Sequence, residues 1–133
     1  MKVFLDTNVV VSAVATRGLC ADLFHLILAE HELVLGETVL TELRQVLRRK
    51  IGLSGETIDE FETFLRRQAR VVMVRNAVPA TGLDAADMAV LAEAATAGAD
   101  VLVTGDRDLL EAADSPLEIV SPRGLWEKFR RVS

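Results

Sequence analysis

Short apolar runs alternate with longer amphipathic segments along most of the chain. Each apolar run has the length of a buried strand, and most of the segments between them repeat apolar residues at helical spacing. The predicted strands cover residues 2–5, 32–35, 71–74, 101–103 and 117–120, and the predicted helices cover 9–15, 19–30, 37–50, 54–69 and 85–97, with a helical turn after Asp106 and a last helix from Pro122. Because strands that alternate with helices form parallel sheets, this order predicts an α/β fold. We expect a mostly parallel sheet of four or five strands with helices on both faces.

Capping residues mark several of the predicted boundaries. Ser54 fits the N-cap of the helix 54–69, and Asp84 fits the N-cap of the helix 85–97, which Gly98 ends. The helices 37–50 and 54–69 are joined by a short turn and are predicted to form an antiparallel hairpin. Residues 75–83, with Pro79 and Gly82 among them, are predicted to form a loop.

The composition indicates one globular domain in a reducing compartment. A chain of 133 residues, half of them hydrophobic, fits a single domain that covers residues 1–133. The lone Cys20 can form no internal disulfide, and no apolar run approaches the length that spans a membrane. We therefore expect a soluble, cytoplasmic protein with no membrane partner.

The net charge of −5 argues against a protein that binds nucleic acid by its overall positive charge. The basic residues nevertheless gather in three groups, which leaves two interpretations open. They can be solvated helix faces that stabilise helix ends, or a surface that guides phosphates. The groups are Arg44, Arg48, Arg49 and Lys50, then Arg66, Arg67 and Arg70, then Arg123, Lys128, Arg130 and Arg131.

Four carboxylates are predicted to meet at one edge of the sheet. Asp6 and Asp106 directly follow two of the apolar strands, and open α/β sheets bind their ligands beside the carboxyl ends of strands. Asp87 lies in the first turn of its predicted helix, and Glu42 lies in the first or second turn of another. Each acid alone also fits a turn former or a helix-start residue. Helices that follow parallel strands begin at the same edge, so the four positions together predict one site.

Such a cluster would have the chemistry of a metal site. Carboxylates this close repel one another, and a cation allows them all to stay ionised. The four acids offer only oxygen ligands, which select Mg²⁺ or Mn²⁺ over Zn²⁺. Magnesium held by a few carboxylates keeps positions open for water and phosphate oxygens, which is an arrangement that hydrolyses phosphodiesters.

Four segments resemble the motifs of PIN-domain ribonucleases. Residues 2–9 look like the opening of that family, Thr41-Glu42-Leu43 matches the acid on its third helix, and residues 84–94 resemble the helix with its third acid. Residues 103–110, Val-Thr-Gly-Asp-Arg-Asp-Leu-Leu, are close to the motif of its fourth acid. This last motif looks most like the toxin components of toxin–antitoxin systems, relatives of VapC-type toxins.

The resemblance implies a three-layer α/β/α fold, homodimers, an antitoxin partner, and cleavage of RNA that depends on Mg²⁺ or Mn²⁺. By match, the catalytic acids are Asp6, Glu42, Asp87 and Asp106, of which Asp6, Asp87 and Asp106 would hold the metal, and the supporting polar residues are Asn8, Thr104, Asp108 and Asp84.

One motif departs from the family pattern. The subgroup often has Asp-Pro-x-Asp-Asp where this chain has Asp84-Ala85-Ala86-Asp87-Met88, which leaves open how Asp84 and Asp87 share their roles.

Other functional classes fit less well. A phosphatase of the haloacid dehalogenase type needs a second Asp two residues after the first, and position 8 is Asn. A phosphoacceptor receiver domain needs an acidic pair near the first strand and a Lys directly after a late strand, and the sequence shows neither at those positions. The alternative that remains is a PIN-like module that binds RNA or a protein without significant nuclease activity.

Overall fold

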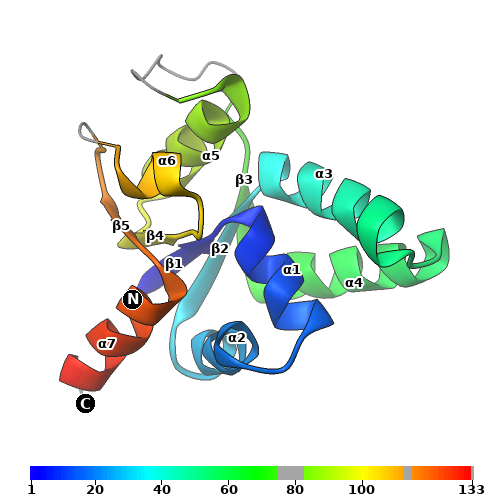
Figure 1. Cartoon of the computed structure of the whole chain (residues 1–133), viewed down its shortest axis with the longest axis horizontal. Coiled ribbons are helices and arrows are strands. Elements are labelled where there is room, and N and C mark those ends of the chain that lie inside the picture. Colours follow the sequence, from blue (N-terminus) through cyan, green and yellow to red (C-terminus); the bar gives the residue numbers. More distant parts are fainter. Residues whose placement is uncertain (75–82, 113–114, 133) are drawn as a thin grey trace.

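The computed structural model describes residues 1–74, 83–112 and 115–132. Its centre is one sheet of five parallel strands in the order β3-β2-β1-β4-β5 (Figure 1). The strands are β1 (Lys2–Leu5), β2 (Glu32–Gly36), β3 (Ala69–Val72), β4 (Val101–Val103) and β5 (Glu118–Val120). The helices are α1 (Thr7–Ala15), α2 (Leu19–Glu30), α3 (Glu37–Val46), the π-helix η1 (Leu47–Ile51), α4 (Gly55–Gln68), α5 (Ala85–Thr96), α6 (Arg107–Leu110) and α7 (Pro122–Val132).

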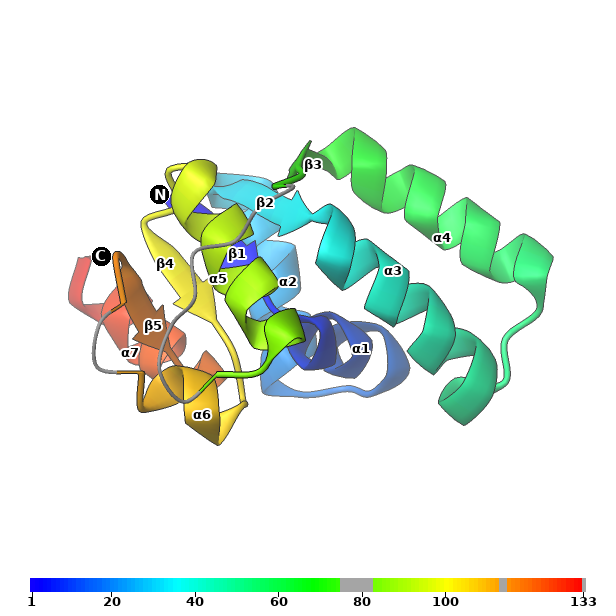
Figure 2. The same ribbon diagram turned by 90° about the horizontal axis from the view of Figure 1, so that it is seen from above.

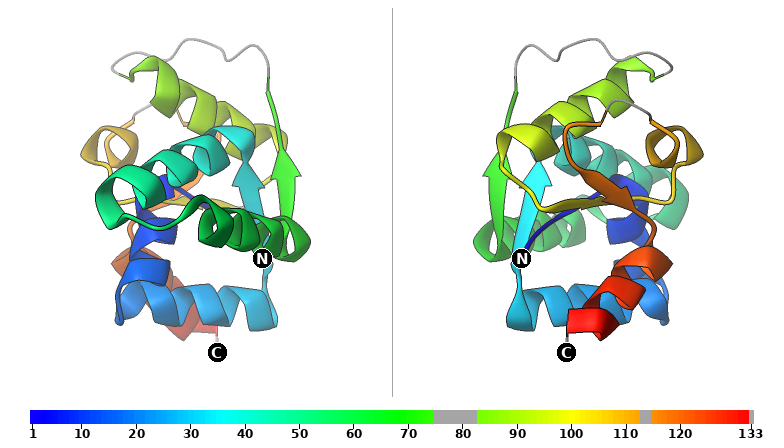
Figure 3. Two further views of the ribbon diagram at one scale, coloured as in Figure 1. Left: turned by 90° about the vertical axis from the view of Figure 1, so that its right-hand side faces the viewer. Right: turned by 90° about the vertical axis from the view of Figure 1, so that its left-hand side faces the viewer.

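Helices cover both faces of this sheet. Helix α5 packs on one face, and α2 and α7 pack together on the other (Figure 3). Helices α3 and α4 lie side by side and extend away from the sheet on the side opposite to α7 (Figure 2). The predicted α/β/α architecture with a parallel sheet is therefore confirmed, and the sheet is parallel throughout.

The middle of the sheet is buried on both faces. Every residue of β4 and residues 3–5 of β1 are buried, which is why these strands are continuous apolar runs rather than alternating ones. From β1 the chain builds β2 and β3 on one side, and it later crosses to build β4 and β5 on the other. The order of strands thus reverses between β1 and β4. In open α/β sheets such a switch point is where ligands bind, beside the carboxyl ends of the strands.

Two predicted boundaries are corrected by the structure. Strand β3 covers residues 69–72 rather than 71–74, because pairing with β2 begins at once where α4 ends, with Ala69 opposite Leu33. The segment 37–50 is not one α-helix, because residues 47–51 form the wider π turn η1. Gly52 ends that turn with a φ of 79°, and its N–H donates to the Leu47 carbonyl.

Other predictions fall at or beyond the limits of the described residues. The loop predicted at 75–83, with Pro79 and Gly82, lies outside the described residues except for Leu83. Among the helices that the structure describes, no single one is long and apolar enough to cross a membrane. Only α1 and α2 together reach that composition, and they meet at an angle of 102°.

Candidate active site

Asp6 lies at the switch point between β1 and β4. Its backbone N–H donates to the Val103 carbonyl at 2.9 Å, and its side chain caps α1 by accepting from the Thr7 N–H at 2.8 Å. The other carboxylate oxygen accepts the Thr104 hydroxyl at 2.7 Å. Asp6 is 8% exposed and Thr104 is fully buried, so hydrogen bonds from the start of α1 and from the residue after β4 fix the orientation of this carboxylate.

Thr104 also positions the acid that follows β4. Its hydroxyl accepts the backbone N–H of Asp106 at 3.0 Å. Asp106 then caps α6, because its Oδ1 accepts the N–H of Asp108 at 2.8 Å. The Thr-Gly-Asp turn therefore links the carboxylate of Asp6 to the backbone N–H of Asp106 through one buried hydroxyl group.

The first turn of α5 brings a third acid, Asp87, to the same edge of the sheet. Asp84 is the N-cap, and its Oδ1 accepts the N–H of Asp87 at 2.8 Å. Asp87 is half-buried, and one oxygen each of Asp87, Asp106 and Asp108 lie within 4.8 Å of one another. The structure thus groups Asp108, expected only as a supporting residue, with two of the acids expected to hold a metal.

Burial and repulsion act strongly on Asp87. Burial is the main cause that raises its pKa to about 6 from the ordinary 3.8, and the carboxylates of Asp106, Asp84, Asp6 and Asp108 raise it further. A group that interacts with four other acids lies in a region of concentrated negative charge. Such a region favours binding of a cation.

Glu42 reaches this region from α3. Its carboxylate accepts the Thr7 hydroxyl at 3.2 Å, which places Glu42 one residue away from Asp6 across the start of α1. Burial raises the pKa of Glu42, and Asp6 and Asp84 raise it further, although the hydrogen bond from Thr7 opposes them. Asn8 is exposed in the first turn of α1. Glu42 therefore lies close to Asp6 and Asp84, and both of these acids also act on Asp87.

The comparison with protein families is decisive at this point. Residues 2–108 match the family model described as the PIN domain, which is most of the chain. The chain belongs to the PIN-domain family. No curated protein sequence matches it.

Solved structures share the fold of this PIN domain at low sequence identity. VapBC2 from Rickettsia felis, solved with a DNA fragment from its promoter, is 15% identical with a TM-score of 0.63, and the match covers 91% of this chain and 98% of that one. VapBC-1 from nontypeable Haemophilus influenzae is 17% identical with a TM-score of 0.66, covering 92% and 99%. FitAcB from Neisseria gonorrhoeae is 21% identical with a TM-score of 0.64, covering 91% and 98%.

One buried acid of this PIN domain was missed by the sequence analysis. Glu93 in α5 is 1% exposed, and its carboxylate accepts the N–H of Thr38 at 3.3 Å and 3.4 Å. It therefore covers the start of α3, the helix that carries Glu42. The sequence does carry a signal, since Glu93 is the single charged residue among the otherwise apolar residues 88–95. A charge in such a buried stretch needs a hydrogen-bond partner, so its position indicates a specific contact.

Gly36 makes this contact possible. A Cβ atom at Gly36 would overlap Glu93 Oε1 and lie 2.6 Å from its Cδ, so only glycine leaves room for the carboxylate. Gly36 is thus needed for a close approach rather than for an unusual backbone conformation, since its φ is −111°.

Asp84 and Asp87 should differ in their effect on the stability of the metal-free PIN domain. Asp84→Ala removes an N-cap and should lower the free energy of unfolding by about 1 kcal/mol. Asp87→Asn should leave it unchanged or raise it at neutral pH. The raised pKa corresponds to at most about 3 kcal/mol, solvent screening reduces this to about 1 kcal/mol, and loss of a favourable helix-dipole interaction of roughly 0.3–1 kcal/mol opposes it.

The pH dependence identifies the group responsible. Because the folded-state pKa of Asp87 is above its ordinary value, protonation of Asp87 contributes stability below pH 3.8 that is lost as the pH rises through about 6. Melts in EDTA should therefore show Asp87→Asn gaining on the unsubstituted protein as the pH rises. A gain for Asp84→Ala instead would reverse the two roles.

Proposed function

We propose that this PIN-domain protein is a metal-dependent endoribonuclease and the toxin of a toxin–antitoxin pair. The observation that carries the proposal is the group formed by Asp87, Asp106 and Asp108, whose oxygens lie within 4.8 Å of one another beside Asp6 and Glu42. Family membership supports the same reaction class, since the sequence motifs of these acids resemble those of PIN-domain ribonucleases.

The donor set fits Mg²⁺ or Mn²⁺. All of its ligand atoms are carboxylate oxygens, and hard divalent cations prefer such ligands. We propose Asp6, Asp87 and Asp106 as ligands and add Asp108, which lies with the last two. Asp6 stays in this set because a carboxylate offers about four lone-pair sites and the hydrogen bonds from Thr7 and Thr104 use two.

The side chains then divide the work around the RNA phosphate. A bound cation supplies a water of lowered pKa and neutralises the charge that develops on the phosphate. Thr104 and Thr7 hold Asp6 in one orientation. Burial raises the pKa of Glu42, which makes its carboxylate a stronger base toward a proton of the attacking water.

The direct test is cleavage by the purified protein. A panel of labelled single-stranded RNAs should be cut with Mg²⁺ or Mn²⁺ and left intact with EDTA. Binding of RNA without cleavage of any of them, with either metal, would support the alternative of a PIN-like binding module.

Two protein partners belong to the proposal. The similarity to VapBC and FitAcB structures favours an antitoxin, and the family resemblance favours a homodimer. Exposed Phe64 on α4 and exposed Ile51 on η1 leave apolar surface for such contacts. Light scattering should find a dimer, and a monomer at high micromolar concentration would exclude it.

A further inference from the structure

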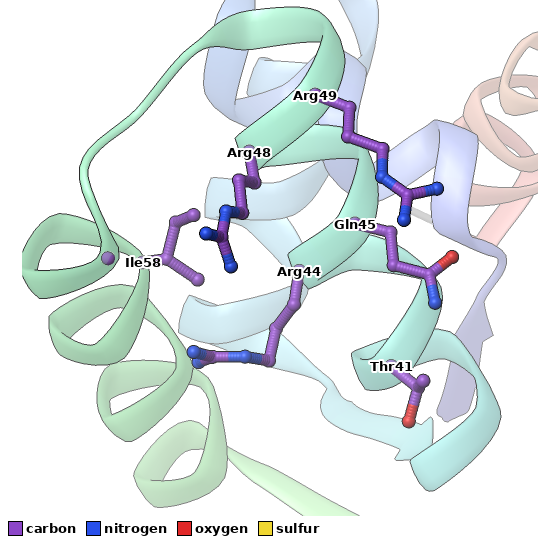
Figure 4. A pocket seen from close by; sticks show the side chains of 7 residues that line it. Thr41, Arg44, Gln45, Arg48, Arg49 and Ile58 are labelled. Atoms are coloured by element: carbon purple, nitrogen blue, oxygen red, sulfur yellow. The ribbon is translucent and has the colours of Figure 1, made fainter.

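A pocket lined mostly by polar and cationic residues lies between α3, η1 and α4. Its volume is about 670 Å³, and Figure 4 shows the side chains that line it. The single apolar side chain in its lining, Ile58, is itself buried. The lining residues are Thr41, Arg44, Gln45, Arg48, Arg49, Gly55 and Ile58, and we call the space that they enclose the arginine pocket.

The three arginines of the arginine pocket differ in their partners. Arg44 forms ion pairs with Asp59 at 2.7 Å and with Glu62 at 3.2 Å. It therefore joins α3 to α4, and its charge is already paired within the protein. Arg48 and Arg49 are exposed, and no carboxylate of the described residues lies within ion-pair distance of either. In a protein with a net charge of −5, these two cations are available to an anion from outside.

The arginine pocket and the candidate active site are both built on α3. Thr41, which lines it, directly precedes Glu42 in α3. Thr41, Gln45 and Arg49 follow at intervals of four residues and lie along one side of the helix (Figure 4). The rise is 1.5 Å per residue in α3 and smaller in the wider π turn η1, so Arg49 lies within about 10 Å of Glu42 along the axis. An RNA strand whose scissile phosphate lies at the carboxylates of the candidate active site can therefore place a neighbouring phosphate at Arg48 and Arg49.

We propose that the arginine pocket binds backbone phosphates of the RNA strand beside the cleaved bond, an inference that rests on the proposed ribonuclease function. Guanidinium groups bind phosphate through two parallel hydrogen bonds, which suits Arg48 and Arg49. The Gln45 amide and the Thr41 hydroxyl can bind ribose and phosphate oxygens of the same RNA strand. Peptide helices dock through apolar anchors, for which this polar lining offers little. An RNA strand therefore fits better than a protein segment.

Binding of a fluorescein-labelled single-stranded RNA in EDTA, followed by anisotropy, tests this assignment. Arg48→Gln/Arg49→Gln should weaken binding at least about tenfold and lower the slope of log affinity against log salt by about 1.4, because each lost phosphate contact on a single strand removes about 0.7. The matched control is Arg67→Gln/Arg70→Gln. It removes the same charge from exposed residues at the end of α4 and in β3, and should change binding less than about twofold.

The outcomes separate this proposal from the proposed function. One outcome is that the unsubstituted protein cuts RNA with Mn²⁺, and that Arg48→Gln/Arg49→Gln, the pocket variant, binds RNA as tightly as the unsubstituted protein. The arginine pocket is then not the phosphate site. Equal losses in both double variants would also overturn it, since they would reflect overall charge. Unchanged RNA binding with loss of an acidic protein partner would reassign the pocket to a peptide. If the protein cuts no RNA but the pocket variant alone loses RNA binding, the pocket stands and the nuclease proposal fails.

Discussion

Asp106→Asn should lower the rate of RNA cleavage at least about 100-fold, which is the scale of losing one preorganised charged group in an active site. The substitution is selective because asparagine is as good an N-cap as aspartate, so the bond from the N–H of Asp108 and the short helix α6 can both remain. Only the charge and one ligand oxygen are lost. The measurement is the single-turnover rate with Mn²⁺ on a labelled RNA.

Asp22→Asn is the matched control for this prediction. Asp22 is an exposed acid in the first turn of α2. The same change there should leave the rate within about twofold, as expected for a surface position. Asp6→Asn is a less clean variant, since an amide N–H₂ in place of Oδ2 would face the Thr104 hydroxyl, which already donates to that oxygen. Near-normal cleavage by Asp106→Asn would remove Asp106 from the catalytic set.

Glu93→Ala should lower the free energy of unfolding by about 1–2 kcal/mol. It leaves the N–H of Thr38 without its carboxylate at the start of α3, which costs about 1 kcal/mol, and it empties buried space beside Gly36, which costs about 0.8 kcal/mol for each buried methylene. Relief of the buried charge offsets part of this loss, because burial raises the pKa of Glu93. Urea unfolding measures the change, and exposed Glu60→Ala on α4 should stay within about 0.5 kcal/mol.

A double-mutant cycle separates this contact from general damage to the core. Gly36→Ala alone forces Glu93 out of its place and should be destabilising by about 1–3 kcal/mol. In the Glu93→Ala background the overlapping atoms are absent, so the same change should cost much less. Additive losses in the double variant would show that Gly36 and Glu93 are not coupled.

Much of the fold could be predicted because local signals and global packing agree. The buried residues 3–5 and 101–103 are continuous apolar runs, and Ser54 and Asp84 are the N-caps that the sequence predicts. The convergence of Asp6 and Asp106 follows from one rule, that parallel strands end at the same edge. The sequence therefore predicted the edge of the sheet where the carboxylates gather.

Features that depend on contacts between distant residues could not be predicted in this way. No Gly or Pro between residues 37 and 51 signals the π turn η1. The position of Asp108 beside Asp87 depends on how α6 and α5 start against each other, which spacing along the chain does not define. The burial of Glu93 requires knowing that α5 crosses the start of α3, 55 residues earlier in the sequence.

The most direct test of the proposed metal site at the edge of the sheet is a calorimetric titration of the protein with Mn²⁺. A metal held by Asp87, Asp106 and Asp108 with Asp6, as we propose, predicts binding that Asp106→Asn and Asp6→Asn each weaken at least about tenfold, with Asp22→Asn unchanged. Mn²⁺ affinity that stays the same in both site variants would contradict a metal centre at this edge of the sheet.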